Sequence, residues 1–229
     1  MIFTFYISVA LSLATVLLRI GARRYVIWLS LFPLYVLQAL QPGVGTDYNS
    51  YIDIVSDKSK VDFFLAKGEY LFYVLAYPVV QFDISPHFIF VEYAIILYLL
   101  TGLSLSRISK DVGGSPATIL VFFFLVSNIY YTQYSGIRYI TSSLALFLAI
   151  SFVVNSSYFR SFSFGVFSIM AHKTAFIFVV PFLLIARFSK NVSRFNSIIL
   201  IVPIATAGLA YITPYLFEIL LPGLGGYIE

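Results

Sequence analysis

The sequence FIFVEYAIILYLLTGLSL, residues 88–105, is an apolar run that contains a single charged residue, Glu92. A helix needs about 20 mostly apolar residues to cross a bilayer, and this run is close to that length. Arg107 and Lys110 follow it, and basic residues in short loops mark the cytoplasmic side of a membrane helix. The stretch therefore predicts a membrane span that ends in the cytoplasm.

The composition of the whole chain also indicates a membrane protein. Of its 229 residues, 60% are hydrophobic and 10% are charged, whereas a soluble domain carries about 25% charged residues. The apolar residues form long runs rather than alternating with polar ones, which predicts helices instead of strands. The sequence contains no cysteine, which excludes disulfides and thiolate metal sites.

The net charge of +4 would suit a nucleic-acid partner if the basic residues gathered on one polar domain. They lie instead in the predicted cytoplasmic turns, where Asp111 is the only acid that accompanies them. Nine of the fourteen basic residues belong to this set, namely Arg19, Arg23, Arg24, Arg107, Lys110, Arg160, Arg187, Lys190 and Arg194. This asymmetry is typical of membrane topology, so we predict no nucleic-acid partner.

Further apolar runs predict the remaining membrane helices. The runs that are read as spans cover residues 2–18, 25–40, 117–129, 140–154 and 197–215. Residues 161–187 have basic residues near both ends and His172 in the middle, which predicts a hairpin that enters and leaves on the cytoplasmic side. Residues 70–82 are apolar but too short to cross, so they predict a re-entrant or tilted helix in the outer leaflet.

Residues 41–69 are polar and mix acidic with basic side chains. This pattern predicts an outer loop that contains short amphipathic helices. The predicted fold class is therefore an all-α, polytopic membrane protein with about eight spans, within a range of seven to nine. We expect a single helical membrane domain over residues 1–229, with its amino terminus outside.

The predicted topology gathers charged residues from separate segments at the outer mouth of the helices. Asp47, Glu69, Arg138, His172 and Lys173 all belong to this group. Arginine offers a planar fork that matches phosphate oxygens, and lysine adds a mobile charge. A hydroxyl that attacks a phosphate-linked sugar needs a proton acceptor, for which aspartate, glutamate or histidine is suitable. Ionisable groups at membrane depth usually mark a substrate pathway, which favours an anionic, lipid-linked substrate.

Structural roles remain open for each of these residues. Arg138 is also compatible with a helix end that reaches the interface, and His172 with Lys173 is compatible with a polar hairpin tip. Asp47 and Glu69 both precede predicted helices, where an acid satisfies backbone donors or the helix dipole.

Other polar residues favour simpler roles. Lys58, Lys60, Lys67 and the neighbouring aspartates predict a solvated face, and His87 predicts an interfacial anchor. Glu92 lies inside an apolar span, so it needs a partner or a wet cavity.

The sequence lacks several motifs of soluble enzymes. It has no phosphate loop, no GxSxG elbow and no HExxH, and it contains only two histidines. Nucleotide hydrolysis and zinc chemistry are therefore poorly supported, and we expect neither a cofactor nor a metal.

Four segments occur in an order and spacing that resemble a known family. They are GTDYNSY at 45–51, EYLFY at 69–73, SGIRYITSSLA at 135–145 and AHKTAFI at 171–177. The first resembles a GxDY..Y motif, the second a glutamate before a short aromatic helix, the third a QxIRQ-type segment and the fourth an F-H-x-S-A-x segment. Together they resemble the EpsG/Wzy-type bacterial polysaccharide polymerases over residues 20–190.

The resemblance implies a glycosyltransferase that acts without a metal at the outer face of the bacterial cytoplasmic (inner) membrane. Such an enzyme joins oligosaccharide repeat units carried on undecaprenyl diphosphate, with apolar walls between spans holding the polyprenyl tails. The implied partners are these lipid-linked oligosaccharides and membrane lipids, together with a chain-length regulator and a flippase. The resemblance further implies a role in the synthesis of O-antigen, capsule or exopolysaccharide.

The resemblance also assigns roles to individual residues. Arg138 and Lys173 would bind the diphosphate, with Tyr48 and Tyr139 contacting the substrate. His172, Asp47 and Glu69 are the three alternatives for proton transfer, and the sequence does not choose among them.

The sequence departs from the family pattern at two places. Tyr139 stands where the family often has glutamine, and the chain ends at Glu229, before the further spans expected of a member. We therefore expect a compact or truncated form.

Two other functions are alternatives to the polymerase. One is a transporter or flippase of lipid-linked sugars, and the other is a membrane acyltransferase that modifies surface polysaccharide, in which His172 would be the base. A purely structural membrane protein is the simplest alternative.

Overall fold

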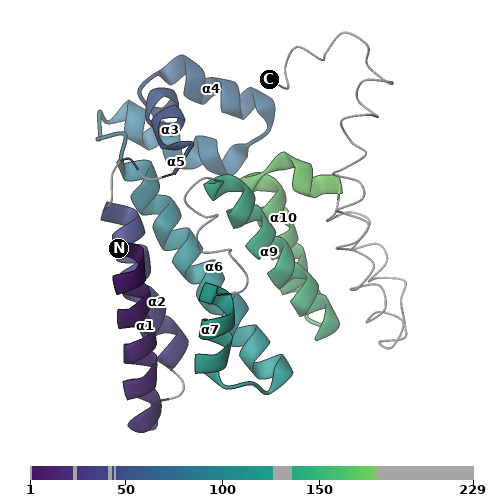
Figure 1. Ribbon diagram of the computed structural model, residues 1–229. Helices are drawn as coiled ribbons and strands as arrows, with labels where there is room; N and C mark the ends of the chain where they lie inside the picture. Colours follow the sequence, from purple (N-terminus) through teal and green to yellow (C-terminus); the bar gives the residue numbers. More distant parts are fainter. Residues whose placement is uncertain are drawn as a thin grey trace, which may run out of the picture. The chain divides into compact units, whose positions relative to one another are not determined.

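The computed structural model describes residues 2–22, 25–40, 43, 45–125, 136–177 and 179. Within these ranges every regular element is a helix (Figure 1), which confirms the all-α prediction for this part of the chain. The described residues belong to one compact unit that ends at Val179. The predicted span at 197–215, the second limb of the hairpin and the start of the Arg138 segment lie outside the described residues.

Most predicted spans correspond to helices with similar bounds. These helices are α1 (Ile2–Arg19), α2 (Val26–Leu40), α6 (Phe88–Val112), α7 (Pro116–Leu125), α9 (Ile137–Val154) and α10 (Tyr158–Ala171). Helix α2 packs against both α1 and α6, while α9 and α10 form an antiparallel pair that contacts α6 through α9 (Figure 1).

One helix in the described ranges, Phe88–Asp111, is long and apolar enough to cross a membrane by length and composition. Shorter apolar helices cover Phe5–Arg19, Val26–Leu40, Tyr70–Gln81 and Ile137–Val153. The number of spans therefore stays a prediction.

The contact between α2 and α6 depends on a close approach at Gly102. A Cβ atom at this position would lie 2.4 Å from Cζ3 of Trp28, so the indole ring occupies the space that a side chain would need. Two hydrogen bonds lie beside this contact, from Tyr98 Oη to the Trp28 carbonyl at 3.0 Å and between Tyr35 Oη and Thr101 Oγ1 at 2.7 Å. Gly102 is therefore required for tight packing of the two helices.

Gly102→Ala is expected to destabilise the protein even though alanine is the better helix former. Overpacking costs about 1–3 kcal/mol, which exceeds the gain of about 1 kcal/mol in helix propensity. The midpoint of thermal unfolding in detergent should fall. Gly114→Ala is the control, because a Cβ there would meet Ile119 Cδ1 at an ordinary 3.4 Å. An unchanged midpoint in Gly102→Ala would contradict the packing described above.

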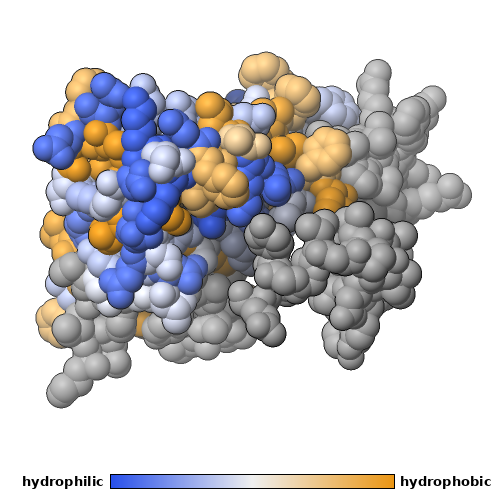
Figure 2. All heavy atoms as spheres, turned by 90° about the horizontal axis from the view of Figure 1, so that it is seen from above, coloured by the Kyte–Doolittle hydropathy of each residue, from blue (hydrophilic) through white to orange (hydrophobic). Residues whose placement is uncertain are grey.

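Three short helices gather at one end of the bundle (Figure 1). They are α3 (Tyr48–Val55), α4 (Lys58–Lys67) and α5 (Tyr70–Gln81). Seen from above, this end shows a largely hydrophilic surface with apolar residues between the polar ones (Figure 2). Helices α3 and α4 confirm the short helices predicted for residues 41–69. Helix α5 has only 12 residues, and its predicted re-entrant or tilted position in the outer leaflet stays a prediction.

The ends of α4 are marked by its flanking residues. Asp57 Oδ1 accepts a hydrogen bond from the Ser59 amide at 2.9 Å, which caps the start of the helix. Gly68 ends it with a left-handed φ of 82°, a conformation that favours glycine. Because α5 begins two residues later, this turn places Lys67 and Glu69 on either side of a sharp change of direction.

Candidate functional site

Glu69 is the most deeply buried acid of the predicted set. It occupies the position before α5, but its side chain makes no capping hydrogen bond. Only 1% of its surface is exposed. A buried carboxylate is costly unless it is paired with a cation, so its neighbours determine what it does.

Arg138, in the first turn of α9, is the principal partner of Glu69. Its Nη1 pairs with Glu69 Oε2, and its Nε donates to Tyr51 Oη at 3.1 Å. The guanidinium group also lies over aromatic rings, at 5.0 Å from the centroid of Phe64 and 5.5 Å from that of Phe72. Helices α3, α4 and α5 therefore all contribute side chains that hold this arginine.

Tyr51 acts as a neutral partner for the guanidinium group. Burial raises the pKa of Tyr51, against the opposing effect of the Arg138 charge, so the phenol keeps its proton at neutral pH. Its oxygen can then accept from Arg138 while its ring provides a cation–π contact at 5.5 Å. This contact orients Arg138 without neutralising it.

Glu69 also lies close to two further nitrogen-bearing side chains. Lys67 Nζ is 3.6 Å from Glu69 Oε1, and His172 Nδ1 is 3.7 Å from the same oxygen. Both distances exceed those of ordinary hydrogen bonds. With Arg138, one carboxylate thus faces two permanent cations, and the cluster carries excess positive charge that is suited to an anionic ligand.

His172 ends α10 with an extended backbone, at φ −156° and ψ 114°. Burial lowers the pKa of His172, and the charges of Arg138, Lys67 and Lys173 lower it further, while Glu69 opposes the shift. The imidazole is therefore neutral at pH 7, and its contact with Glu69 is dipolar rather than an ion pair. A neutral imidazole keeps one basic nitrogen, as a proton acceptor requires.

The structure thus brings Glu69, Arg138 and His172 together, as the topology predicted. Lys173 lies beside them in a 3₁₀ turn (Lys173–Ala175) with an exposed side chain. Tyr139 is 59% exposed and meets the His172 ring edge-on at 6.4 Å between centroids. Both are placed where a ligand of the cluster could contact them.

Asp47 and Tyr48 have other contacts. Asp47 Oδ1 accepts from Thr46 Oγ1 at 3.1 Å, and Asp47 forms no ion pair with another described residue. Asp47 precedes α3, but it makes no capping hydrogen bond. Tyr48 stacks on Phe90 at 4.7 Å and bonds to His87 Nδ1 at 3.1 Å. Their roles in substrate contact or proton transfer stay predictions.

Sequence reasoning missed two contributors to the cluster. The sequence predicts a solvated face for Lys67 as well as for Lys60. The Lys60 and Lys67 side chains are 42% and 38% exposed, so both lie on a solvated face. The Lys60 amine pairs with Asp53 at 2.5 Å, whereas the Lys67 amine lies beside the buried carboxylate of Glu69. Tyr51 belongs to the first quoted motif, one turn after Asp47, which was the available signal for it.

Two other polar residues can now be placed. His87 Nε2 lies 2.8 Å from the Ala39 carbonyl oxygen, so His87 joins the end of α2 to the start of α6 rather than acting only as an interfacial anchor. Glu92 Oε2 is buried and has no hydrogen-bond partner in the described part of the chain. The described ranges contain no group of three or more potential metal ligands.

The profile of the EpsG family matches residues 24–229. This chain belongs to the EpsG family. Membership in the EpsG family, together with the apolar helices, identifies it as a membrane protein related to polysaccharide biosynthesis. No curated protein and no solved structure matches it significantly. The match covers all four motifs that carried the resemblance, including the segments of Glu69, Arg138 and His172.

Proposed function

We propose that this EpsG protein is a polysaccharide repeat-unit polymerase, a glycosyltransferase that joins oligosaccharides carried on a lipid diphosphate. The protein would cross the bacterial cytoplasmic membrane about eight times and would act at the outer face of this membrane. The observation that carries the proposal is the cluster in which Arg138 and Lys67 share the buried carboxylate of Glu69 beside a neutral His172.

The cluster suits a reaction in which a diphosphate leaves a sugar. The hydroxyl oxygen of the incoming unit would attack the anomeric carbon of the growing chain, and the bond from that carbon to the diphosphate oxygen would break. Negative charge would accumulate on the leaving diphosphate, where preorganised cations lower the barrier. Arg138, Lys67 and Lys173 are the residues that we assign to this role.

The hydroxyl proton needs an acceptor near the cations. His172 is neutral at pH 7, so it can take the proton, whereas Glu69 is buried and already paired with Arg138. We therefore assign His172 as the base and Glu69 as the residue that positions Arg138 and Lys67. This assignment chooses among the three candidates that the sequence left open.

A reconstituted assay tests the proposed function. The purified protein is placed in vesicles with lipid-linked repeat units, and the lengths of the lipid-linked glycans are measured with the polyprenyl diphosphate that is released. Extension with release of one diphosphate for each bond formed supports the polymerase. Movement of units across the bilayer without extension would support the flippase instead.

The pH dependence of turnover should report the state of His172. Because the neutral imidazole is the active form and its pKa is lowered, the rate should be constant at neutral pH. It should fall with acidification below the ordinary histidine value of about 6.5. Lys67→Met removes a charge that lowers this pKa, so the acid limb should move to higher pH. Lys60→Met is the matched control, since Lys60 pairs with Asp53; a limb unaffected by Lys67→Met would refute the assignment.

A further inference from the structure

A second cationic cluster lies at the C-terminal end of α6, away from the start of this helix where α5 packs. Arg107 Nε donates to Ser151 Oγ of α9 at 2.9 Å and lies 3.1 Å from Asp111 Oδ2. The Nη2 nitrogen of the same arginine is buried and has no hydrogen-bond partner in the described ranges. A buried donor that is left unmatched is costly. The Arg107 side chain is 16% exposed, so the rest of its guanidinium group can meet an acceptor from outside the protein.

A second guanidinium group approaches the same aromatic ring. Arg107 Cζ is 5.5 Å and Arg160 Cζ is 5.7 Å from the centroid of Phe152. Arg160 is exposed and forms no ion pair with any other residue that the structure describes. Asp111 offsets only one of the two charges, so the cluster retains the positive charge that an anion requires.

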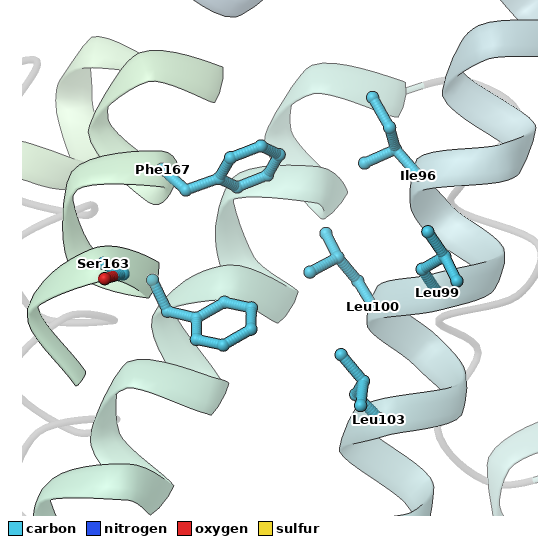
Figure 3. A pocket seen from close by; sticks show the side chains of 7 residues that line it. Ile96, Leu99, Leu100, Leu103, Ser163 and Phe167 are labelled. Atoms are coloured by element: carbon cyan, nitrogen blue, oxygen red, sulfur yellow. The ribbon is translucent and has the colours of Figure 1, made fainter. Parts of the chain in front are cut away.

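An apolar pocket of about 370 Å³ lies between α6 and α10. This volume falls within the range of about 300–1,000 Å³ that is usual for ligand sites. Figure 3 shows the two walls facing each other, with Ser163 and Phe167 on α10 opposite Ile96, Leu99, Leu100 and Leu103 on α6.

The pocket leads to the arginine pair. Leu103 lies four residues before Arg107 and Phe164 four residues after Arg160, and residues four apart share one face of a helix. Phe164 lines the pocket and also stacks on Phe152, with 5.5 Å between ring centroids. Phe152, whose ring lies near both guanidinium groups, is thus packed against Phe164 in the pocket wall.

From this juxtaposition we infer that Arg107, Arg160 and the α6–α10 pocket form a binding site for an anionic phospholipid. The phosphate would lie on the two guanidinium groups, whose planar geometry matches phosphate oxygens, and one acyl chain would fill the pocket. A free hydrated phosphate would leave the apolar walls unused, and a neutral lipid would leave the net charge unmatched.

This site is independent of the proposed polymerase activity. The lipid-linked substrate would place its diphosphate on Arg138, whereas the phospholipid would place its phosphate near the other end of α6. The charge asymmetry of the sequence predicts that this other end faces the cytoplasm. The inferred ligand is therefore a structural lipid of the cytoplasmic leaflet rather than a donor or an acceptor of sugar.

Lipid binding can be followed through a tryptophan placed in the pocket of the full-length protein. Phe167→Trp supplies the reporter, and Trp28→Phe removes the single native tryptophan. Phosphatidylglycerol and phosphatidylcholine with brominated acyl chains are titrated separately into the protein in neutral detergent micelles. Phosphatidylglycerol should quench at a concentration roughly 25-fold lower, since each of the two arginines contributes about 1 kcal/mol, or about fivefold, to anionic lipid binding.

Arg160→Gln in the reporter protein tests the head-group contact, because this side chain is exposed and forms no ion pair with another described residue. It should weaken phosphatidylglycerol quenching about fivefold and leave phosphatidylcholine unaffected. Arg107→Gln should do the same. Arg19→Gln, which changes the exposed arginine in the last turn of α1, is the matched control and should have no effect.

Four results would overturn the inference. They are equal quenching by the two lipids, unchanged quenching in Arg160→Gln, an equal loss in Arg19→Gln, and displacement of phosphatidylglycerol by millimolar inorganic phosphate. The last result would show a site for a free anion instead of a lipid.

Discussion

Replacement of Arg138 by alanine is expected to abolish polymer formation while the chain still inserts into the membrane. The change removes the guanidinium group that we assign to the leaving diphosphate. Loss of one preorganised electrostatic contact lowers turnover by about 10²–10³-fold in other enzymes. Glycan length after incubation with purified lipid-linked repeat units measures the effect.

A second variant separates loss of catalysis from loss of folding. Arg138→Ala leaves the buried Glu69 without its main partner, and breaking a buried pair in this way costs about 3–5 kcal/mol. Combining it with Glu69→Gln removes the unpaired charge, so the double variant should recover thermal stability but not activity. Polymer of normal length distribution from either variant would reject the role of Arg138.

Replacement of His172 by alanine is expected to reduce turnover by about 10²–10⁴-fold, the usual contribution of a positioned base. Substrate affinity should change much less, because the cations that bind the diphosphate remain. Steady-state rates with purified lipid-linked units in detergent measure both quantities. Added imidazole should restore part of the rate if the missing group is a proton acceptor.

The only other histidine in the sequence provides the control for this experiment. His87 joins the Ala39 carbonyl to Tyr48, so His87→Gln should keep much of that hydrogen bonding and turn over normally per folded molecule. A His172→Ala protein with the rate of the unsubstituted chain would exclude His172 as the base. Equal losses in both variants would point to a structural cause.

The helices of the membrane bundle could be predicted largely from apolar runs. The predicted run at 88–105 corresponds to α6, which continues to Val112. The prediction stopped short because residues 106–112 are mostly polar, yet the helix continues through them. Arg107 and Asp111 form an i,i+4 pair there, which supports a helix, and Gly113 ends it with a left-handed φ of 67°.

The composition of the candidate site was predicted in part. Topology alone placed Glu69, Arg138 and His172 on one side of the bundle, and the structure brings them into contact. The sequence could not show that the exposed amine of Lys67 lies beside Glu69. This position depends on the left-handed turn at Gly68 and on burial of Phe64 beneath Arg138. Hydropathy treats all the lysines of residues 41–69 alike, so a three-dimensional packing preference of this kind is invisible to it.

Three side chains of the cluster share one carboxylate, that of Glu69, so the free-energy changes caused by substituting them depend on one another. Lys67, Arg138 and His172 all lie against it, so removing one of them alters the electrostatic surroundings of the other two. Residues that share a partner are energetically coupled. Free-energy changes obtained from single substitutions are therefore not additive here. Combined variants are needed to measure the coupling free energy between each pair of side chains.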